Sequence, residues 1–506
     1  MTTRLRYAWI PIVTASALAL TACGGEDDTG GQNATDVQGT YAPAQPAQPA
    51  QPAQPNEPGN TFEDEGVSGY VDAASDPLST FALDVDNGSY RIAQAYAAQG
   101  TRPPSESVRA EEWVNAFAYG DPAPTEADLA VRTESGVRPE ADGAQLVRVA
   151  VTAREVAAAE RPSVNLTLVV DRSGSMGEGN RIGLVKDSLA LLAGSLRPDD
   201  TVSVVSFDDQ VELLLPPTPV SENERVLASV DDLYPRGSTN LADGLSLGYE
   251  QARSAYRPGG INVVVLCSDG VANVGMTGPE GITASIAEAG REGIHLVTVG
   301  YGMGSYNDHL MEQLADQGDG FYRYVDTYEE AQDLYVDELT SLLAPVADDA
   351  RTQVSFDPEL VSSYRLVGYE NRAMDDHSFA DLSADAGELG AGHHASALYE
   401  VWTAPGVDAG TPIGTAQVLW KTPGTNAPAS ASAPVLAADP EAPMSDSLAL
   451  ATAVADLAQI TQGYGVDGEP PASAYDVQAR AAELATRGVP GAAELAELAQ
   501  QLGSLG

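Results

Sequence analysis

Positive charge is scarce in this chain of 506 residues. Lysine and arginine together number 26, against 73 aspartates and glutamates, and the formal net charge is −47. The only lysines are Lys186 and Lys421. Such a field repels a phosphate backbone, so the composition disfavours nucleic-acid binding. It favours basic partners or partners held through a metal ion.

Cysteine and long hydrophobic runs are also scarce. Cys23 and Cys267 are the only cysteines, and they offer no disulfide framework. The apolar stretch Trp9–Leu20 is too short to span a bilayer comfortably, and no later segment offers about 18 consecutive apolar residues. Cys267 falls inside a predicted strand, where we expect a small buried side chain without a chemical role.

The N-terminal residues have the order of an export signal. Two arginines precede the apolar stretch, which ends in Leu20-Thr21-Ala22-Cys23. This order resembles the lipobox of bacterial lipoproteins, in which the cysteine is acylated and becomes the mature N-terminus. The resemblance implies a lipoprotein signal peptide over residues 1–23, lipidation of Cys23, and a lipid-anchored protein of the cell envelope that faces the periplasm or the exterior. An ordinary secretory signal is the alternative, and Gly24 favours the outer membrane if the cell is Gram-negative.

Residues 24–60 have the composition of a disordered linker. The triplet Ala-Gln-Pro repeats from Ala44 to Pro55. Proline at every third position favours an extended polyproline II chain of about 3.1 Å per residue, which cannot build a core. We expect a spacer between the lipid anchor and the globular body, with a proline-motif recognition site as the weaker alternative.

From about Ser163 to Leu343, apolar strands alternate with amphipathic helices. The runs Leu166–Val170 and Val263–Cys267 are almost continuously apolar, which is typical of strands buried on both faces of a parallel sheet. The alternation predicts a doubly wound α/β domain over residues 163–345, with Gln210–Leu215 as an antiparallel edge strand. With the strands that contain these two runs, the remaining predicted strands of the sheet are Ser163–Val170, Thr201–Phe207, Ile261–Cys267 and Ile294–Val299. The predicted helices are Arg181–Leu196, Glu222–Leu233, Leu241–Tyr256, Glu280–Arg291 and Asn307–Gln317.

Polar loops follow these apolar elements where a ligand would bind. Asp171-Arg172-Ser173-Gly174-Ser175 follows the first strand, and Ser268-Asp269-Gly270 follows the strand that ends at Cys267. Gly237-Ser238-Thr239-Asn240 precedes a predicted helix. Ligands of open α/β sheets bind beyond the carboxyl ends of the strands, so we expect these three loops to meet there.

Together the three loops resemble the metal-ion-dependent adhesion site of von Willebrand factor type A (VWFA) domains. The resemblance implies hydroxyl ligands from Ser173, Ser175 and Thr239, and carboxylate ligands from Asp171 and Asp269. Oxygen donors without histidine or cysteine select hard cations, Mg²⁺ first, with Mn²⁺ or Ca²⁺ also suitable. In the family an acidic side chain of a protein partner completes the coordination sphere. A degenerate, metal-free domain is the alternative.

Asp243 is a weaker candidate of the same site. It lies in the first turn of the helix that follows Thr239, from where it could orient the metal ligands. An ordinary carboxylate that stabilises the helix N-terminus is an equal alternative.

The flanks extend the resemblance beyond the central domain. Thr80–Tyr90 and Val108–Asn115 on one side, and Tyr364–Arg372 and Asp385–His393 on the other, resemble the conserved flanks of bacterial VWFA lipoproteins often labelled calcium-activated chloride-channel-like. We expect an N-terminal flanking module over residues 69–160, a β-rich module over 350–425 and a helical module over 444–506. Alternating strands in Leu129–Val156 and Thr352–Lys421 predict one β-sandwich interrupted by the central domain.

Zinc-protease and nucleotide-binding motifs are not found. The five histidines form no HExxH, there is no P-loop, and acidic residues are too frequent for a carboxylate pair to indicate a hydrolase. We therefore expect a non-enzymatic envelope lipoprotein that binds protein partners through its metal site, in an adhesion, scaffold or assembly role. The alternative is a structural envelope protein in which the metal only stabilises the fold. An envelope hydrolase is the least favoured interpretation.

Overall fold

The computed structural model describes residues 60–83, 85–138, 144–270, 279–304, 306–463 and 472–505. These residues belong to one compact unit that spans Glu57–Gly506. The predicted signal peptide, Cys23 and the linker up to residue 59 lie outside the described residues. Within the described residues no helix combines the length and the apolar character needed to cross a membrane.

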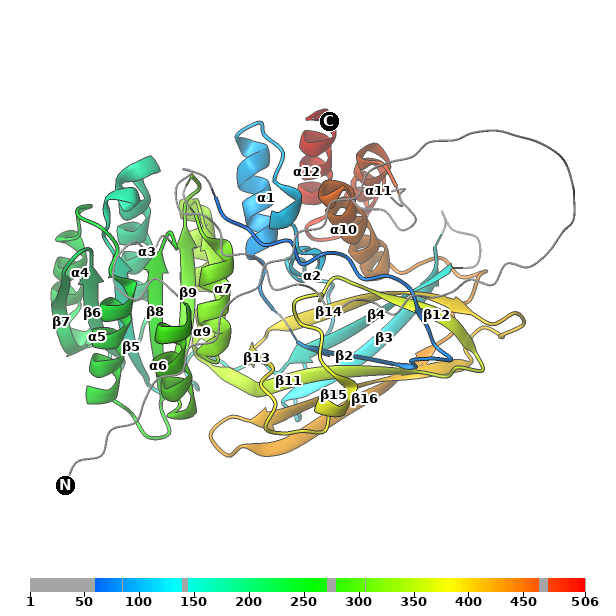
Figure 1. Cartoon of the computed structure of the whole chain (residues 1–506), viewed down its shortest axis with the longest axis horizontal. Coiled ribbons are helices and arrows are strands. Elements are labelled where there is room, and N and C mark those ends of the chain that lie inside the picture. Colours follow the sequence, from blue (N-terminus) through cyan, green and yellow to red (C-terminus); the bar gives the residue numbers. More distant parts are fainter. Residues whose placement is uncertain are drawn as a thin grey trace, which may run out of the picture. The chain divides into compact units, whose positions relative to one another are not determined.

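The central region forms an α/β domain around one mixed sheet (Figure 1). The strand order is β10-β9-β8-β5-β6-β7, in which β7 alone of these strands pairs antiparallel. The strands are β5 (Val164–Asp171), β6 (Thr201–Phe207), β7 (Val211–Pro219), β8 (Ile261–Ser268), β9 (His295–Tyr301) and β10 (Tyr322–Val325). The helices are α3 (Arg181–Ser195), α4 (Asn223–Asp231), α5 (Leu241–Ser254), α6 (Pro279–Arg291), α7 (Asp308–Gln317), α8 (Tyr328–Gln332) and α9 (Leu339–Leu343).

Alternate residues of the central strands face opposite layers of helices. Leu166 and Leu168 of β5 belong to the same buried cluster as Leu189 of α3. Val169 instead belongs to a cluster with Leu245 of α5. Since side chains alternate along a strand, helices on both faces bury both rows, and the predicted doubly wound α/β fold is confirmed.

The edge strand β7 is longer than the sequence pattern predicts. It continues to Pro219 instead of ending at Leu215, and it pairs with β6 through register shifts near Val204. The prolines of β7 interrupt the alternation of apolar and polar residues, which is why the sequence predicts a shorter strand. An edge strand tolerates proline because its outer side has no neighbouring strand and needs no backbone N–H donors.

The flanks on either side of the α/β domain combine into two further sheets of the described chain, with strand orders β1-β12-β14-β4-β3 and β13-β11-β15-β16, where β2 also pairs with β11. Strands before the domain are β1 (Val71–Asp72), β2 (Leu78–Ala82), β3 (Leu129–Val137) and β4 (Ala144–Ala153). Strands after it are β11 (Pro345–Phe356), β12 (Val361–Val367), β13 (Gly387–Gly390), β14 (His394–Thr403), β15 (Pro412–Thr422) and β16 (Ala427–Leu436).

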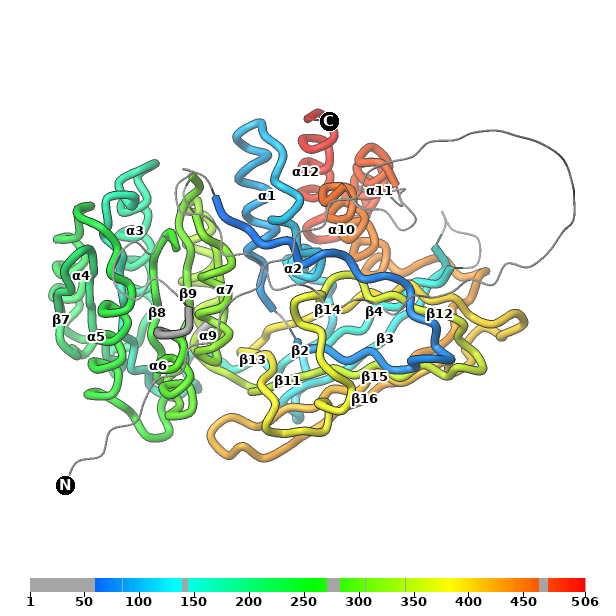
Figure 2. The backbone as a smooth tube through the Cα atoms, viewed as in Figure 1, coloured from blue at the N-terminus to red at the C-terminus, as the bar shows by residue number. Residues whose placement is uncertain are grey.

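Strands far apart in the sequence pair within these sheets. Val149 of β4 lies opposite Ala397 of β14, and Thr80 of β2 lies opposite Gln353 of β11. The smooth tube of Figure 2 shows β2 in blue beside the yellow-green β11. Across the sheets, the ring of Phe356 on β11 stacks on Tyr364 of β12 at 4.5 Å between centroids. The two flanks therefore share one β-sandwich, as the alternating strands predict.

Helices cover the outer face of the sandwich. They are α1 (Gly88–Ala98), α2 (Ala110–Asn115), α10 (Asp446–Gln462), α11 (Ala474–Thr486) and α12 (Ala492–Ser504). Trp113 of α2 and Leu457 of α10 share a buried cluster with Leu146 of β4 and Leu398 of β14. The C-terminal segment is helical, as predicted.

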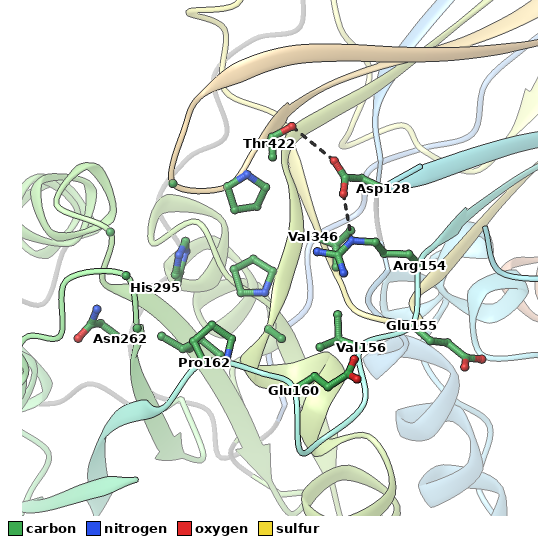
Figure 3. A pocket seen from close by; sticks show the side chains of 18 of the residues that line it. Asp128, Arg154, Glu155, Val156, Glu160, Pro162, Asn262, His295, Val346 and Thr422 are labelled. Carbon is green, nitrogen blue, oxygen red and sulfur yellow. Dashed lines mark hydrogen bonds and ion pairs between the residues drawn. The ribbon is translucent and has the colours of Figure 1, made fainter. Parts of the chain in front are cut away.

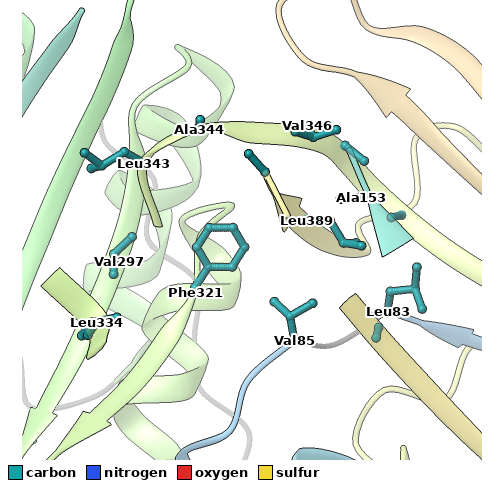
Figure 4. Packing of buried hydrophobic residues seen from close by; sticks show 14 of the residues in the cluster. Leu83, Val85, Ala153, Val297, Phe321, Leu334, Leu343, Ala344, Val346 and Leu389 are labelled. Atoms are coloured by element: carbon teal, nitrogen blue, oxygen red, sulfur yellow. The ribbon is translucent and has the colours of Figure 1, made fainter. Parts of the chain in front are cut away.

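The α/β domain and the sandwich share a hydrophobic core. Phe321 and Val297 come from the α/β domain, and Val85 and Leu389 come from the flanks, yet all four belong to one buried cluster (Figure 4). This junction lies beside the start of β10, where Phe321 is 6% exposed. The two parts are therefore packed against each other and are not joined by the chain alone.

Candidate metal site

The site begins at the carboxyl end of the central strand. Asp171 is the last residue of β5, and it pairs with Phe207, the last residue of β6. On the other side of β5, strand β8 ends at Ser268, directly before Asp269. Because these strands are parallel, both aspartates lie at the same edge of the sheet, where ligands bind in open α/β folds.

Asp171 organises the first loop. Its Oδ1 accepts a hydrogen bond from the Ser173 amide at 2.8 Å, and its Oδ2 accepts one from the Ser268 hydroxyl at 2.7 Å. The hydroxyl oxygens of Ser173 and Ser175 lie 3.1 Å apart. Asp171 is fully buried and Ser173 nearly so, whereas Ser175 is partly exposed, so the oxygen atoms of this loop reach from the interior toward solvent.

The third loop is held against the first by backbone hydrogen bonds. The Gly174 amide donates to the Gly237 carbonyl at 3.1 Å, and the Arg236 amide donates to the Arg172 carbonyl at 2.7 Å. These bonds bring Thr239, which is 1% exposed, to the edge that carries Asp171. Gly237 has a φ of +68°, and a Cβ there would lie 2.2 Å from Asp209 Oδ1, so the loop requires glycine at this position.

Asp269 completes the predicted set and meets a buried arginine. It is fully buried, and its Oδ2 accepts a hydrogen bond from Arg181 Nη1 at 2.8 Å. The same guanidinium donates to the carbonyl oxygens of Ser175 at 3.0 Å and of Met303. Burial and then the charge of Asp269 raise the pKa of Asp171 to about 7. Two buried carboxylates that oppose each other's ionisation favour a bound cation.

The donor set fits a hard divalent cation. The edge offers carboxylate and hydroxyl oxygens from Asp171, Ser173, Ser175, Thr239 and Asp269, with no nitrogen or sulfur donor among them. Mg²⁺ prefers such oxygen ligands and keeps coordination positions for water or a partner. The carboxylates of Asp171 and of Asp269, which also pairs with Arg181, would supply the negative charge around the ion, while the serine and threonine hydroxyls would add neutral donors.

Asp243 contacts Asn240 at the start of α5. Its side chain is exposed, and its carboxylate accepts a hydrogen bond from Asn240 Nδ2 at 2.8 Å. Its amide in turn donates to the Asn240 side chain at 3.4 Å, in the manner of a helix cap. Within the described residues it makes no hydrogen bond to the five predicted ligands, so this geometry supports a role at the helix N-terminus, and a role in orienting the ligands stays a prediction.

Two residues that contact the site are missing from the prediction. Ser268 anchors Asp171, and Arg181 neutralises Asp269. A signal for Arg181 was present in the sequence, because it begins α3, and a cation in the first turn of a helix is disfavoured by the helix dipole unless another contact holds it. Ser268 had no such signal, since a serine at a strand end is common.

Further arginines surround the edge despite the strongly acidic composition. Arg172 Nε and Arg236 Nε each donate to Asp208 Oδ2 at 2.7 Å. The Arg172 side chain is 2% exposed, whereas that of Arg236 is 41% exposed. Arg236 is therefore a cation on the surface beside the metal site.

A cavity of about 620 Å³ lies at the opposite end of the strands and contains none of the five predicted ligands (Figure 3). Ile261, Asn262 and His295, at or near the amino ends of β8 and β9, line it from the α/β domain. Arg154 lines it from the sandwich side, where it donates to Asp128 at 3.0 Å. The cavity is thus separate from the metal edge.

The cysteine and the adjacent histidines have roles in packing. Cys267 is fully buried in β8, and burial raises the pKa of its thiol to about 12, which makes it unreactive. His393 Nδ1 accepts a hydrogen bond from the Gly390 amide at 3.0 Å, and burial, followed by the charge of Arg323, holds its pKa well below its usual value. His394 Nε2 lies 3.0 Å from the Phe117 carbonyl. These contacts give both histidines a role in packing.

Known families match three consecutive parts of the chain. Residues 165–337 match the von Willebrand factor type A domain, and residues 341–503 match the family described as uncharacterized protein YfbK, C-terminal. Residues 56–148 match a family described as von Willebrand factor. The family boundaries follow the α/β domain and its two flanks.

Curated relatives share parts of this arrangement. The uncharacterized protein YfbK of Escherichia coli K12 is 37% identical over 336 residues, which are 65% of this chain and 58% of YfbK. Inter-alpha-trypsin inhibitor heavy chain H3 of Rattus norvegicus is 29% identical over 176 residues, which are 33% of this chain and 19% of the relative. The matches therefore span less than two thirds of the length of either relative.

Among solved structures, von Willebrand factor type A from Catenulispora acidiphila is similar with a TM-score of 0.44 and 16% identity, over 77% of this chain and 89% of that one. A proximal thread matrix protein from the mussel byssus, with a zinc-occupied adhesion motif, has a TM-score of 0.30 and 21% identity, over 35% of this chain and 46% of that one. With the family matches, the strand order and the site loops, the chain is a protein with a von Willebrand factor type A domain, carried between two flanking segments.

Proposed function

We propose that this protein is a lipid-anchored component of the cell envelope that binds a protein partner through a divalent cation at Asp171, Ser173, Ser175, Thr239 and Asp269. Cys23 carries the lipid, and the proline-rich segment separates the anchor from the body. Mg²⁺ is the expected ion, and Mn²⁺ or Ca²⁺ would also suit the donors. The role is one of adhesion, scaffolding or assembly, without catalysis.

The burial of two carboxylates beside three hydroxyl-bearing residues carries this proposal. Asp171 and Asp269 are fully buried at one sheet edge, and the pKa of Asp171 is raised by burial and by Asp269. Two neighbouring negative charges would not stabilise a domain that used this edge only for packing. VWFA domains typically mediate metal-dependent protein interactions, and this edge has the residues for one.

The charge around the edge supports an acidic group as the docking element. The chain as a whole carries a net charge of −47, which repels acidic proteins at long range. At the edge, however, the bound cation would be a local positive charge, since the guanidinium of Arg236 is already paired with Asp208 and Glu212. An aspartate or glutamate of the partner could complete the metal coordination.

The substitution Asp171→Asn tests the proposal, because it keeps the shape of the side chain and removes the charge that binds the ion. We expect the full-length variant to lose metal affinity by at least about 10–100-fold. A loss of this size already follows when a residue that only hydrogen-bonds to a metal ligand is removed. Partners that the wild type retains from envelope extract with Mg²⁺, and releases with EDTA, should not be retained by the variant. Asp187→Asn, at an exposed position of α3, is the matched control and should behave as the wild type.

The melting temperature separates the proposal from the structural alternative. If the metal serves recognition, Asp171→Asn should abolish partner capture while the protein melts within a few degrees of the wild type. If the variant instead unfolds, or if Mg²⁺ and EDTA give the same retained proteins, the site only stabilises the fold and the proposed function is wrong.

A further inference from the structure

A second group of carboxylates lies where the α/β domain meets the sandwich. Asp319 lies between α7 and β10, whereas Asp385 precedes β13 and Glu388 lies within it. One carboxylate oxygen from each of these three side chains lies within 4.8 Å of the other two. Two oxygens that each contact one Ca²⁺ at about 2.4 Å can be at most about 4.8 Å apart, so the three can reach a single ion.

Glu388 is the member of this group that lacks a partner. It is 6% exposed, and its carboxylate makes no hydrogen bond or ion pair with a described residue. On neighbouring β11, Asp348 Oδ1 is buried without a hydrogen-bond partner. An ionised carboxylate this far from solvent is unfavourable unless a cation or a donor compensates its charge, so Glu388 and Asp348 favour a cation beside them.

The protein's own cations do not satisfy the group. Lys421 is paired with Asp349, and Arg351 donates to the backbone carbonyls of Asp349, Ser378 and Asp381. His295 Nδ1 lies 2.7 Å from the backbone carbonyl of Asp319 and not from its carboxylate. Only two permanent positive charges, Lys421 and Arg351, and one histidine therefore lie among five carboxyl groups. These carboxyl groups belong to Asp319, Asp348, Asp349, Asp385 and Glu388.

The ionisation of the group reflects this imbalance. Burial and then the charges of Asp319 and Asp385 hold the pKa of Glu388 well above its usual value. Burial and neighbouring carboxylates likewise raise the pKa of Asp385 to about 6, and burial is the main cause that raises the pKa of Asp348 to about 6. A cation bound among these carboxylates would favour their ionised forms and lower these pKa values.

Closely packed backbone segments hold the carboxylates in place on both sides of the junction. Asp319 has a φ of +49°, and the adjacent Gly320 packs so closely that a Cβ would lie 1.9 Å from the Leu296 carbonyl. Gly387, next to Glu388, similarly meets the Leu83 carbonyl, at 1.7 Å from an added Cβ. The hydrophobic contacts of Phe321 and Leu389, shown in Figure 4, lie directly beside these segments in the chain.

We propose that Asp319, Asp385 and Glu388 bind a calcium ion that joins the von Willebrand factor type A domain to the β-sandwich. Ca²⁺ accepts carboxylates from separate chain segments in irregular geometry, whereas Mg²⁺ requires nearly octahedral ligands. Asp385 is exposed, which gives the ion access from solvent, and Asp348 adds a fourth carboxylate nearby. The site is independent of the metal edge at Asp171, because it uses different residues and loops.

Calcium counting on the full-length chain in detergent tests the proposal. After equilibrium dialysis against Ca²⁺, the wild type should hold one more tightly bound ion per chain than the double variant Asp385→Asn, Glu388→Gln. Asp319→Asn, on the other side of the junction, should lose the same ion. Asp171→Asn should keep it, so that failure of this site and failure of the proposed function are distinguished.

Thermal melting of the same proteins provides a second readout. Ca²⁺ should raise the melting temperature of the wild type and of Asp171→Asn above that in EDTA, and the rise should be smaller in the double variant, which keeps only the edge at Asp171. The matched control is Glu329→Gln, Asp333→Asn, which neutralises two exposed carboxylates outside this group. An unchanged calcium count in the double variant would overturn the proposal, and so would equal melting of the wild type in Ca²⁺ and EDTA.

Discussion

Replacing Arg109 with methionine should lower the free energy of unfolding by at least about 3–5 kcal/mol, the cost of removing one partner from a buried ion pair. Arg109 precedes α2 in the N-terminal flank, and its Nη1 contacts Asp308 of α7 at 2.6 Å. Its Nε contacts Glu112 and lies 3.7 Å from Glu312. All four side chains are at most 7% exposed, so the substitution leaves three buried carboxylates without their shared cation.

Urea unfolding at pH 7 measures this loss. Arg91→Met is the matched control, because Arg91 lies in the same flank and its contact with Glu494 is long, at 3.8 Å, and partly exposed. Such surface pairs contribute about 0–1 kcal/mol, so the control should unfold close to the wild type. If Arg109→Met also unfolded within about 1 kcal/mol of the wild type, the arginine would not hold α7 to the flank as the structure indicates.

Replacing Glu400 with glutamine should have a comparable effect inside the sandwich. Glu400 of β14 accepts hydrogen bonds from Arg138, from Arg365 Nε at 3.0 Å and from the Tyr70 hydroxyl at 2.6 Å. It is 4% exposed, and the two arginines are buried as well. Arg138 keeps Asp456 as a second partner, but Arg365 is left with the neutral Gln459, so we expect a loss of about 3–5 kcal/mol at pH 7. Glu292→Gln, in an exposed pair with Arg253, is the control and should change stability by less than about 1 kcal/mol.

The effect of Glu400→Gln should depend on pH in a defined direction. Burial alone would raise the pKa of Glu400, but Arg365 and then Arg138 outweigh burial and hold the pKa below its usual value. The unfolded glutamate, with a pKa of about 4.3, then takes up its proton before the folded one does as pH falls. The contribution of the charge is complete above about pH 4.3 and is lost as pH falls through the folded pKa. The free energies of unfolding of the wild type and of Glu400→Gln, measured in urea at pH 7, 4 and 3, should converge as pH falls. A constant difference would show that the charge of Glu400 is not its cause.

Local sequence patterns were sufficient for the α/β domain and for the position of its polar loops at one edge of the sheet. Strand Thr201–Phe207 has the predicted bounds, because its apolar run ends at polar residues on both sides. The loop residues Asp171 and Asp269 could be placed at one edge because each directly follows a buried run of a parallel sheet. In both cases the information lies within about ten residues of chain, the length of a strand and its following loop.

Contacts between distant segments could not be predicted in this way. Asp319 and Glu388 are ordinary acidic residues in a chain with 73 of them, and only the packing of β13 beside the α/β domain brings them together. Arg109 gives no local signal either, since its partners Asp308 and Glu312 lie on a helix of the other domain. The alternation of apolar and polar residues identifies β4 as a strand. Its pairing with β14 could be predicted only through a hypothesis about the whole topology.

The insertion of the α/β domain between β4 and β11 has a consequence for the order of folding. The α/β domain is continuous in sequence and can fold as soon as its own residues are synthesised. The sandwich cannot, because Val149 pairs with Ala397 only after the whole inserted domain has emerged. Closure of such a distant pair is slow, and until then β4 offers an unpaired edge to other chains. In refolding experiments, hydrogen-exchange protection of β5 and β8 should therefore precede that of β4 and β14, and simultaneous protection would show that the inserted domain does not fold first.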